Sequence, residues 1–202
     1  MPGVPSRIAA TERRSLLVDA ALAVAERDGV PAMSVRRVAD EAGVSLGLVH
    51  YCFSDKDELV VQVAARIVAE LAEAGEERLA GVAGGTLEQA LLAGVRGLWT
   101  VLTATARRQL VTYEITTHAL RHPGLRDVAR EQYAVSQAAV EEFLAHAART
   151  AGATWSGPVG ELAALTLAVI DGVTLRWLVD GDGDGALARL EAFARTLLRE
   201  AG

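Results

Sequence analysis

The sequence of 202 residues predicts an all-α fold, and three observations support this prediction. Ala, Leu, Arg and Glu, which all favour helices, are abundant along the chain. Apolar residues recur at helical spacing, whereas no stretch shows the sustained alternation of a strand. Glycine and proline interrupt this pattern at intervals that leave room for about nine helices. The expected architecture is a set of three short N-terminal helices packed on a larger antiparallel helical bundle.

The N-terminal elements have clear start and stop signals. Residues 11–28 are predicted as a first helix, which Gly29 ends. Ser34 is placed as the N-cap of a second helix that runs to residue 41. A third short helix is expected over residues 45–51.

The next elements follow from the same signals. Gly43 supplies the positive φ of a tight turn, and Ser45 caps the third helix. Ser54 is expected to cap a long fourth helix that ends near residue 80. Thr86 opens the fifth helix. Four further helices are predicted over residues 107–121, 124–150, 158–179 and 185–200.

The segment from Ser34 to Lys56 carries the strongest functional signal. Two short helices joined by a tight glycine turn are the pattern of a helix-turn-helix, whose second helix lies in the DNA major groove. Within that second helix, Leu46, Gly47 and Leu48 could approach thymine methyl groups. The helix offers no Arg, Asn or Gln for bidentate base reading, so direct readout is expected to be modest.

This segment resembles the N-terminal domain of the TetR family of bacterial regulators over about residues 11–60. The matching residues are Gly29, Ser34, Val35, Val38, Ala39, Ala42, Gly43, Val44, Ser45, Gly47, Val49, Tyr51, Phe53, Lys56 and Leu59. The resemblance implies an all-helical homodimer with an N-terminal DNA reader and a C-terminal domain for ligand binding and dimerisation. The stretch SLGLVHYCF is most similar to members that include betaine-responsive ones.

Three positions depart from the family pattern. His50 and Cys52 replace residues that are usually aromatic, and Leu46 replaces a common lysine or threonine. His50 could still donate to a phosphate, whereas Cys52 cannot replace an aromatic hydroxyl. We therefore expect fewer hydrogen bonds to the DNA phosphates than is usual in the family. Lys56 matches a family phosphate contact beside the free N–H groups of a helix start.

We therefore expect residues 1–53 to form the DNA-binding domain and residues 54–202 the ligand-binding and dimerisation domain. Arg36 and Arg37 are equally well explained as solvated charges, and a basic arm of Arg7, Arg13 and Arg14 is a further possibility. The candidate DNA contacts are Ser34, Arg36, Arg37, Ser45, Leu46, Gly47, Leu48, His50, Tyr51 and Lys56.

The C-terminal domain contains polar and aromatic residues in helices that should be partly buried. Glu114 and His118 are i, i+4 neighbours that either hydrogen-bond each other or line a ligand cavity. A different class of function, a small helical enzyme, would use the same two residues as an acid–base pair. The candidate ligand contacts are Trp99, Tyr113, Glu114, Thr117, His118, Tyr133, Phe143 and Asp171.

The last two predicted helices are apolar on more than one face, which is more than one monomer can bury. A two-fold pair of chains would cover the excess as a four-helix bundle. The candidate interface residues are Leu165, Val169, Gly172, Leu187, Leu190, Phe193 and Leu197.

An aspartate–glycine run between these helices fits a calcium-binding loop, with Asp180, Asp182, Asp184 and Glu191 as ligands. The competing interpretation is a polar turn in which Asp182 or Asp184 caps the last helix.

Composition limits the remaining classes of function. Half of the residues are apolar, and a single cysteine excludes an internal disulfide framework and a cysteine-rich zinc module. The net charge of −6 argues mildly against nucleic acid, but residues 1–57 hold 7 Lys and Arg against 8 Asp and Glu and are near neutral. No apolar run reaches bilayer length and residues 1–11 lack the apolar region of a secretory signal. The sequence thus predicts a cytoplasmic, ligand-responsive repressor that binds operator DNA as a homodimer, with no cofactor, resident metal or membrane partner.

Overall fold

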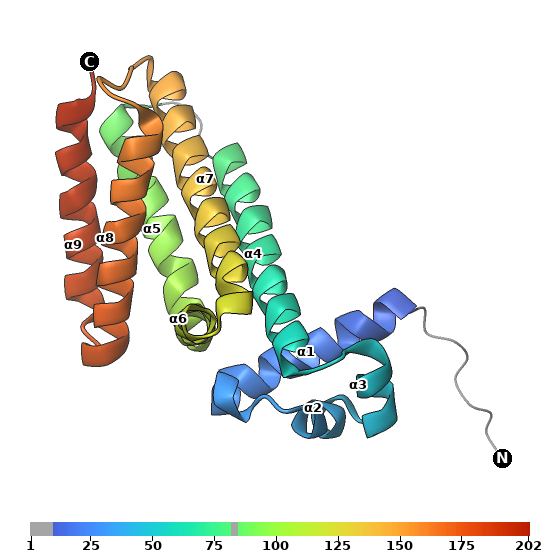
Figure 1. The fold of residues 1–202 in the computed structure, drawn as a ribbon. Helices are drawn as coiled ribbons and strands as arrows, with labels where there is room; N and C mark the ends of the chain where they lie inside the picture. The colour runs from blue at the N-terminus through green and yellow to red at the C-terminus, as the bar shows by residue number, and fades with distance from the viewer. Residues whose placement is uncertain (1–9, 82–84) are drawn as a thin grey trace. The chain divides into compact units, whose positions relative to one another are not determined.

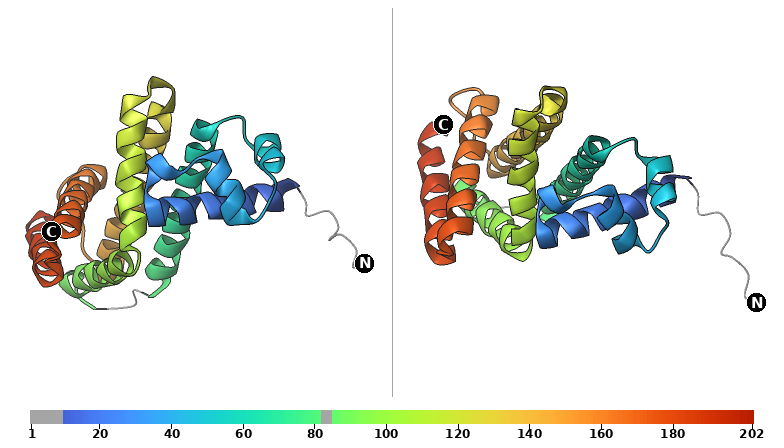
Figure 2. Two further views of the ribbon diagram at one scale, coloured as in Figure 1. Left: turned by 90° about the horizontal axis from the view of Figure 1, so that it is seen from below. Right: turned by 60° about the horizontal axis from the view of Figure 1, so that its bottom comes forward.

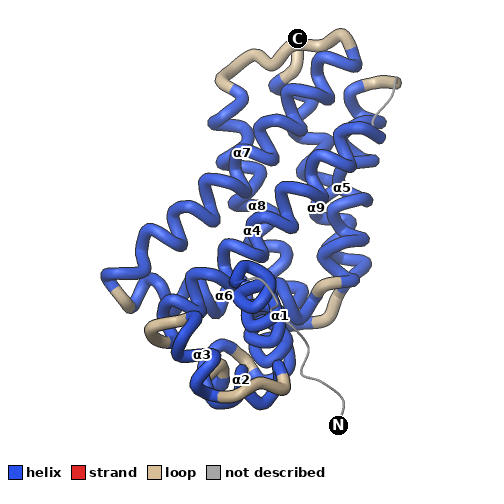
Figure 3. The backbone as a smooth tube through the Cα atoms, turned by 90° about the vertical axis from the view of Figure 1, so that its right-hand side faces the viewer, coloured by secondary structure: helices blue, strands red, loops and turns tan. Residues whose placement is uncertain are grey.

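A computed structural model describes residues 10–81 and 85–202 of the chain, without the side chains of 71–81. The described residues form helices joined by short loops (Figure 3). The only strand-like feature among them is an isolated bridge between Trp155 and Ala201. The α-helices are α1 (Ala10–Asp28), α2 (Val35–Ala42), α3 (Leu46–Cys52), α4 (Lys56–Gly81), α5 (Leu87–Ala104), α6 (Ala106–Arg121), α7 (Arg126–Ala151), α8 (Val159–Asp180) and α9 (Gly183–Leu197) (Figure 1). Three short 3-10 helices complete the order, η1 (Val30–Ala32), η2 (Pro123–Leu125) and η3 (Leu198–Glu200).

The predicted helices are confirmed to within a few residues, and most of the predicted caps are confirmed with them. The Ser34 and Ser45 side chains accept from the backbone N–H groups of Arg37 and Leu48. Thr86 forms a reciprocal capping box with Gln89. The cap of α4 was predicted incorrectly, because Asp55 rather than Ser54 accepts from the N–H of Glu58.

The chain divides into two compact units. The first comprises residues up to Ile67 and the segment Val111–Ala129, and the second comprises Val68–Leu110 and Arg130–Gly202. The first unit therefore takes in the beginning of α4 and the C-terminal part of α6 in addition to α1, α2 and α3.

The helices of the first unit belong together because they share one apolar core. Helices α1, α2 and α3 pack against one another, as the blue to cyan ribbons show (Figure 2). Leu17 of α1, Val38 of α2 and Val49 of α3 are all fully buried in one core. Val111 and Ile115 of α6 are buried in that same core. Burying each side chain of this size contributes about 1.5–3 kcal/mol relative to exposure.

The second unit is a helical bundle in which α9 packs against both α5 and α8 (Figure 1). One part of its core surrounds Leu91, Leu144 and Ala163, and another surrounds Trp99, Ala186 and Leu190. The core thus draws on α5, α7, α8 and α9.

Helix α8 is unusually exposed for such an apolar segment. Only Ala163 and Thr174 are buried along it, whereas Leu165, Leu175 and Val179 are exposed, Val179 to 82%. Among the described residues it is also the one helix whose length and composition would suffice to cross a membrane. One face of α8 is therefore apolar and uncovered in the single chain.

The contact between α5 and α7 depends on a glycine, which generates a prediction. A Cβ atom on Gly94 would overlap the ring of Phe143, so Gly94→Ala should force the ring or its helix to move. We expect a loss of about 1–3 kcal/mol in the free energy of unfolding, measured by thermal or denaturant melting followed by circular dichroism. Gly157→Ala in the same unit is the control, because nothing lies within 4 Å of a Cβ there. Equal stability of the two variants would contradict this account of the packing.

Candidate nucleic-acid interface

The two helices α2 and α3 are held by one turn and one shared core. Gly43 ends α2 in the left-handed region at φ 64°, and its N–H donates to the carbonyls of Ala39 and Asp40. The N–H of Val44 then donates to Ala39 at 3.0 Å, which closes the turn. A non-glycine residue at position 43 would be strained there, so the angle between the helices depends on this glycine.

The outer face of α3 is not covered by any other part of the chain that the structure describes. Tyr51 is 77% exposed and Leu46 is 43% exposed, and Gly47 and His50 are exposed beside them. Leu48 is half-buried and packs against the core of the first unit. The helix therefore presents small, apolar and hydrogen-bonding groups together on one surface.

The two arginines at the start of α2 differ in their partners. Arg36 is exposed and makes no ion pair with the described residues. Arg37 pairs with Asp28 at 2.7 Å, and Asp28 also pairs with Arg27 at 3.1 Å. Arg27 in turn pairs with Glu41 at 2.8 Å, and this hydrogen bond lowers the pKa of Glu41. Arg37 is thus part of a charge network, whereas Arg36 is available.

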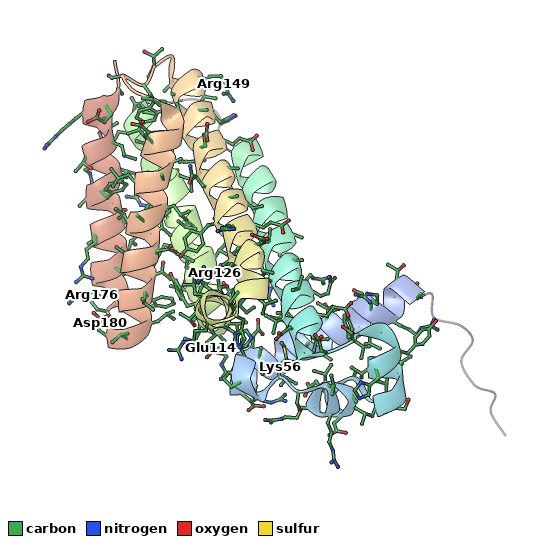
Figure 4. All side chains as sticks on the ribbon, viewed as in Figure 1. Lys56, Glu114, Arg126, Arg149, Arg176 and Asp180 are labelled. Atoms are coloured by element: carbon green, nitrogen blue, oxygen red, sulfur yellow. The ribbon has the colours of Figure 1, made fainter. Side chains whose placement is uncertain are left out.

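Lys56 lies at the start of α4, where its Nζ donates to the carbonyl of Pro31 at 3.1 Å (Figure 4). It is half-buried, and this bond uses one of the three N–H donors of its ammonium group.

A second charge cluster joins α1 to the start of α4. Arg14 donates to the carbonyl of Cys52 and pairs with Glu58 at 2.8 Å, with its guanidinium 4.5 Å from the centre of the Phe53 ring. The backbone N–H of Ser54 donates to Glu58, and this bond, together with Arg14 and the Ser54 hydroxyl, lowers the pKa of Glu58 to about 2. Arg14 therefore has a structural role here, and Arg7 of the predicted basic arm lies outside the described residues.

Glu114 and His118 lie on the part of α6 that belongs to the first unit. The Val30 N–H at the start of η1 donates to Glu114 Oε2 at 2.5 Å (Figure 4). His118 Nε2 lies 3.5 Å from Asp57 Oδ1, and its ring stacks on His122 at 4.0 Å between centres. The two side chains thus have separate partners, and the acid–base pair of an enzyme is not supported.

The eight candidate ligand residues are divided between the two units. Tyr113, Glu114, Thr117 and His118 lie in the first unit, and Trp99, Tyr133, Phe143 and Asp171 lie in the second. The structure therefore does not show them as one group.

In the second unit, Asp171 of α8 accepts a hydrogen bond from Tyr133 of α7. Partial burial and this bond raise the pKa of Tyr133 to about 12, so the phenol remains a donor at neutral pH. Trp99 of α5 packs edge to face on Trp177 of α8, with 5.0 Å between ring centres. The sequence reasoning missed Thr174 and Trp177, of which only Thr174 lies at helical spacing (i, i+3) from Asp171.

The alternative interpretation of residues 180–191 as a calcium loop is not supported by the local structure. Helix α9 already begins at Gly183, and Asp182 caps it by accepting from Gly185 N–H at 2.9 Å. Asp180 accepts from the backbone N–H of Asp182 at 3.0 Å and pairs with Arg176 at 3.1 Å, and both contacts lower its pKa. Glu191 pairs with Arg96 at 2.8 Å, which lowers the pKa of Glu191. Within residues 10–81 and 85–202 we find no group of three or more potential metal ligands.

Comparisons with known proteins match both parts of the chain. The family model described as bacterial regulatory proteins, tetR family, matches residues 17–63, and that described as tetracyclin repressor-like, C-terminal domain, matches residues 86–201. The nicotine-responsive transcriptional repressor HdnoR of Paenarthrobacter nicotinovorans is 29% identical over 180 residues, which are 86% of this chain and 88% of that protein. The transcriptional regulator BetI of Cronobacter sakazakii is 34% identical over 85 residues, 42% of each chain. A transcriptional regulator from Rhodococcus sp. Rha1 superposes with a TM-score of 0.74 at 26% identity, covering 93% of this chain and 97% of the other.

The environment of Glu58 generates a prediction about acid stability. Because its pKa is lowered from 4.5 to about 2, Glu58 stabilises the fold fully above pH 4.5, and this contribution is lost as the pH falls through about 2. Glu58→Gln should therefore lower stability at pH 7 and flatten the decline of stability between pH 4.5 and 2, measured by denaturant melts across this range. Asp40→Asn, which removes an exposed carboxylate from the same unit, should leave the decline unchanged. A wild-type slope in Glu58→Gln would refute the assigned role.

Proposed function

Because this chain belongs to the TetR family of bacterial transcriptional regulators, we propose that it is a repressor that leaves its operator when a small molecule binds its C-terminal domain. The observation that carries this proposal is the exposed outer face of α3, which a buried inner face and the Gly43 turn hold in place. A recognition helix must lie in the major groove with its side chains accessible, and α3 meets that requirement. As a DNA-binding regulator the protein would act in the cytoplasm and without catalytic turnover.

The proposed DNA contacts divide by the chemistry they offer. Arg36 and Tyr51 are exposed and would contact phosphates, while Leu46, Gly47 and Leu48 would contact base edges. Arg37 is already paired with Asp28 and Lys56 already donates to the Pro31 carbonyl, so we expect smaller contributions from them than from Arg36. The remaining candidates are Ser34, Ser45 and His50, which are all exposed.

A homodimer is proposed from the uncovered apolar face of α8. Leu165, Leu175 and Val179 share this face with Gly172. A Cβ atom added at Gly172 would have no other atom within 4 Å, so this position is uncovered as well. Two copies related by a two-fold axis would bury this surface and place two copies of α3 on one operator.

Helix α9 contributes fewer residues to the proposed dimer interface than the sequence suggested. Leu190 and Leu197 are 2% and 4% exposed because they form the unit's own core, so we leave them out of the interface. Val169, Leu187 and Phe193 are half-buried and remain in it.

Helix α6 supports a route from ligand to DNA, because this single helix begins in the second unit and ends in the first. In the first unit Ile115 is buried in the core and Glu114 holds the Val30 N–H. A ligand that binds the C-terminal domain more tightly when α6 is in one position than in another would favour one state of the DNA-binding unit. The free energy of such coupling is about 1–3 kcal/mol. The relative HdnoR is by name a nicotine-responsive repressor, which supports ligand control of this kind.

Arg36→Ala tests the proposed DNA contact. We expect the mutation to weaken binding to the promoter DNA beside the gene by about tenfold and to reduce the slope of log affinity against log salt by about 1, as measured by fluorescence anisotropy. Arg107→Ala on α6 is the control and should bind as the wild type does, because this exposed arginine lies in the second unit. Lack of any sequence-specific, salt-dependent complex with the wild-type protein would refute the proposed function.

Val179→Glu tests the dimer. A carboxylate on the uncovered face of α8 would be repelled by its own copy across the two-fold axis, so sedimentation should shift from dimer to monomer and DNA affinity should fall with it. Leu120→Glu is the control, because Leu120 is also exposed, at 57%, but lies in the first unit. A monomeric wild-type protein, or a dimeric Val179→Glu variant, would exclude this interface.

A further inference from the structure

Asp28 is a carboxylate in the charge network that joins α1 to α2. It is the last residue of α1, and its Oδ2 accepts from Arg37 Nη2 at 2.7 Å and from Arg27 Nε at 3.1 Å. Arg27 Nη2 also donates to Oε2 of Glu41, near the end of α2, at 2.8 Å. Two arginines and two carboxylates thus form one network whose charges cancel.

Arg37 lies where a DNA phosphate is expected. It occupies the first turn of α2, and its backbone N–H donates to the hydroxyl of Ser34, which caps this helix. In helix-turn-helix proteins the first of the two helices crosses the DNA backbone, and the N-terminal ends of helices attract phosphates. Asp28 therefore places a carboxylate beside an arginine of the proposed DNA contact.

The stability of α1 does not explain an acidic residue at position 28. The C-terminal end of a helix carries partial negative charge, which disfavours a carboxylate there and favours a cation such as Arg27. The side chains of Arg37 and Asp28 are 49% and 28% exposed, and ion pairs with this exposure contribute little to folding because water and salt screen them. The larger consequence of the pair is that it offsets the charge that Arg37 presents to a phosphate.

Single arginines matter for DNA binding because this part of the chain has no general excess of positive charge. Residues 1–57 hold 7 Lys and Arg against 8 Asp and Glu. Attraction to DNA then depends on local charge, and here that means arginines such as Arg36 and Arg37. Each cation that neutralises a phosphate steepens the dependence of log affinity on log salt by about 1. A carboxylate that offsets one arginine should therefore have a measurable effect on binding.

We propose that Asp28 is a built-in counter-ion of Arg37 that holds down the affinity of the protein for DNA. The carboxylate competes with a phosphate for the guanidinium and repels the phosphate itself. Arginine has five N–H donors, so the pair weakens the phosphate contact of Arg37 without abolishing it. Lower affinity for DNA of any sequence limits retention at the many competing sites of a genome. The inference rests on the proposed function, because it assigns to Asp28 the strength of the proposed DNA contact.

Asp28→Asn tests the counter-ion, because it removes the charge and nearly preserves the size of the side chain. Asparagine is tolerated near the C-terminal ends of helices, so the variant should melt as the wild type does when followed by circular dichroism. We expect its affinity to rise about two- to fivefold, both for the promoter DNA beside the gene and for an unrelated duplex of equal length. The salt slope measured by fluorescence anisotropy should steepen by up to about 1.

Asp40→Asn is the matched control. Asp40 is exposed on α2 of the same unit and makes no ion pair with the residues that the structure describes. The variant changes the net charge by the same amount as Asp28→Asn, so it should show only the smaller effect of net charge and an unchanged salt slope. Equal effects of the two variants would overturn the proposal.

Arg37→Ala separates a counter-ion from a carboxylate with a purely structural role. In the Arg37→Ala background, Asp28→Asn should change DNA affinity no more than Asp40→Asn does, because no guanidinium remains to be released. A gain in affinity that persists without Arg37 would overturn the proposal. Weaker DNA binding by Asp28→Asn would overturn it too, since the carboxylate would then hold Arg37 in place for the phosphate.

The wild-type protein in the same experiment keeps the two proposals apart. A wild-type protein that forms a specific, salt-dependent complex, together with an Asp28→Asn variant of unchanged affinity, refutes only the role of Asp28. A wild-type protein that forms no specific DNA complex refutes the proposed function, whatever the variants show.

Discussion

The burial of Val38 and Val49 in one core is the constraint on which the reading surface depends. These two side chains fix the inner faces of α2 and α3, and Gly43 allows the chain to turn between them at a positive φ. Because the inner faces are fixed by close packing, the small and apolar side chains on the opposite face of α3 stay exposed to solvent. The exposure of Tyr51 and Leu46 is thus a consequence of the packing beneath them.

The carboxylates of the first unit show how charge supports this packing. Glu58 accepts from the Ser54 backbone and from Arg14, and Glu114 accepts from Val30 N–H. A carboxylate that is partly removed from water needs donors, and backbone N–H groups at helix starts provide them. These residues therefore join α1, α4, α6 and η1 within the unit, a role that their residue types alone do not distinguish from ligand binding or catalysis.

The second unit, by contrast, has more apolar surface than its own core buries. Helix α8 places Ala163 and Thr174 inward but leaves Leu165, Leu175 and Val179 outside. The sequence pattern correctly indicated an excess of apolar surface on α8, but it also counted Leu190 and Leu197, which the unit needs for itself. Periodicity reveals how many apolar faces a helix has, whereas only the packed neighbours decide which face is already covered.

The sequence by itself determined the local features of this protein. The helix limits, the Ser34, Ser45 and Thr86 caps, the Gly43 turn and the family resemblance all follow from residues within a few positions of one another, because helix propensity, capping and turn geometry are short-range effects. Asp182 was foreseen as a cap for the same reason, and the rival calcium loop failed because α9 begins at Gly183. Only the tertiary structure decided that Glu114 binds the Val30 backbone, that Arg37 pairs with Asp28, and that Trp177 meets Trp99. Those partners are 84, 9 and 78 residues apart in sequence, and the position of one helix against another is set by packing over the whole core, which local spacing does not encode.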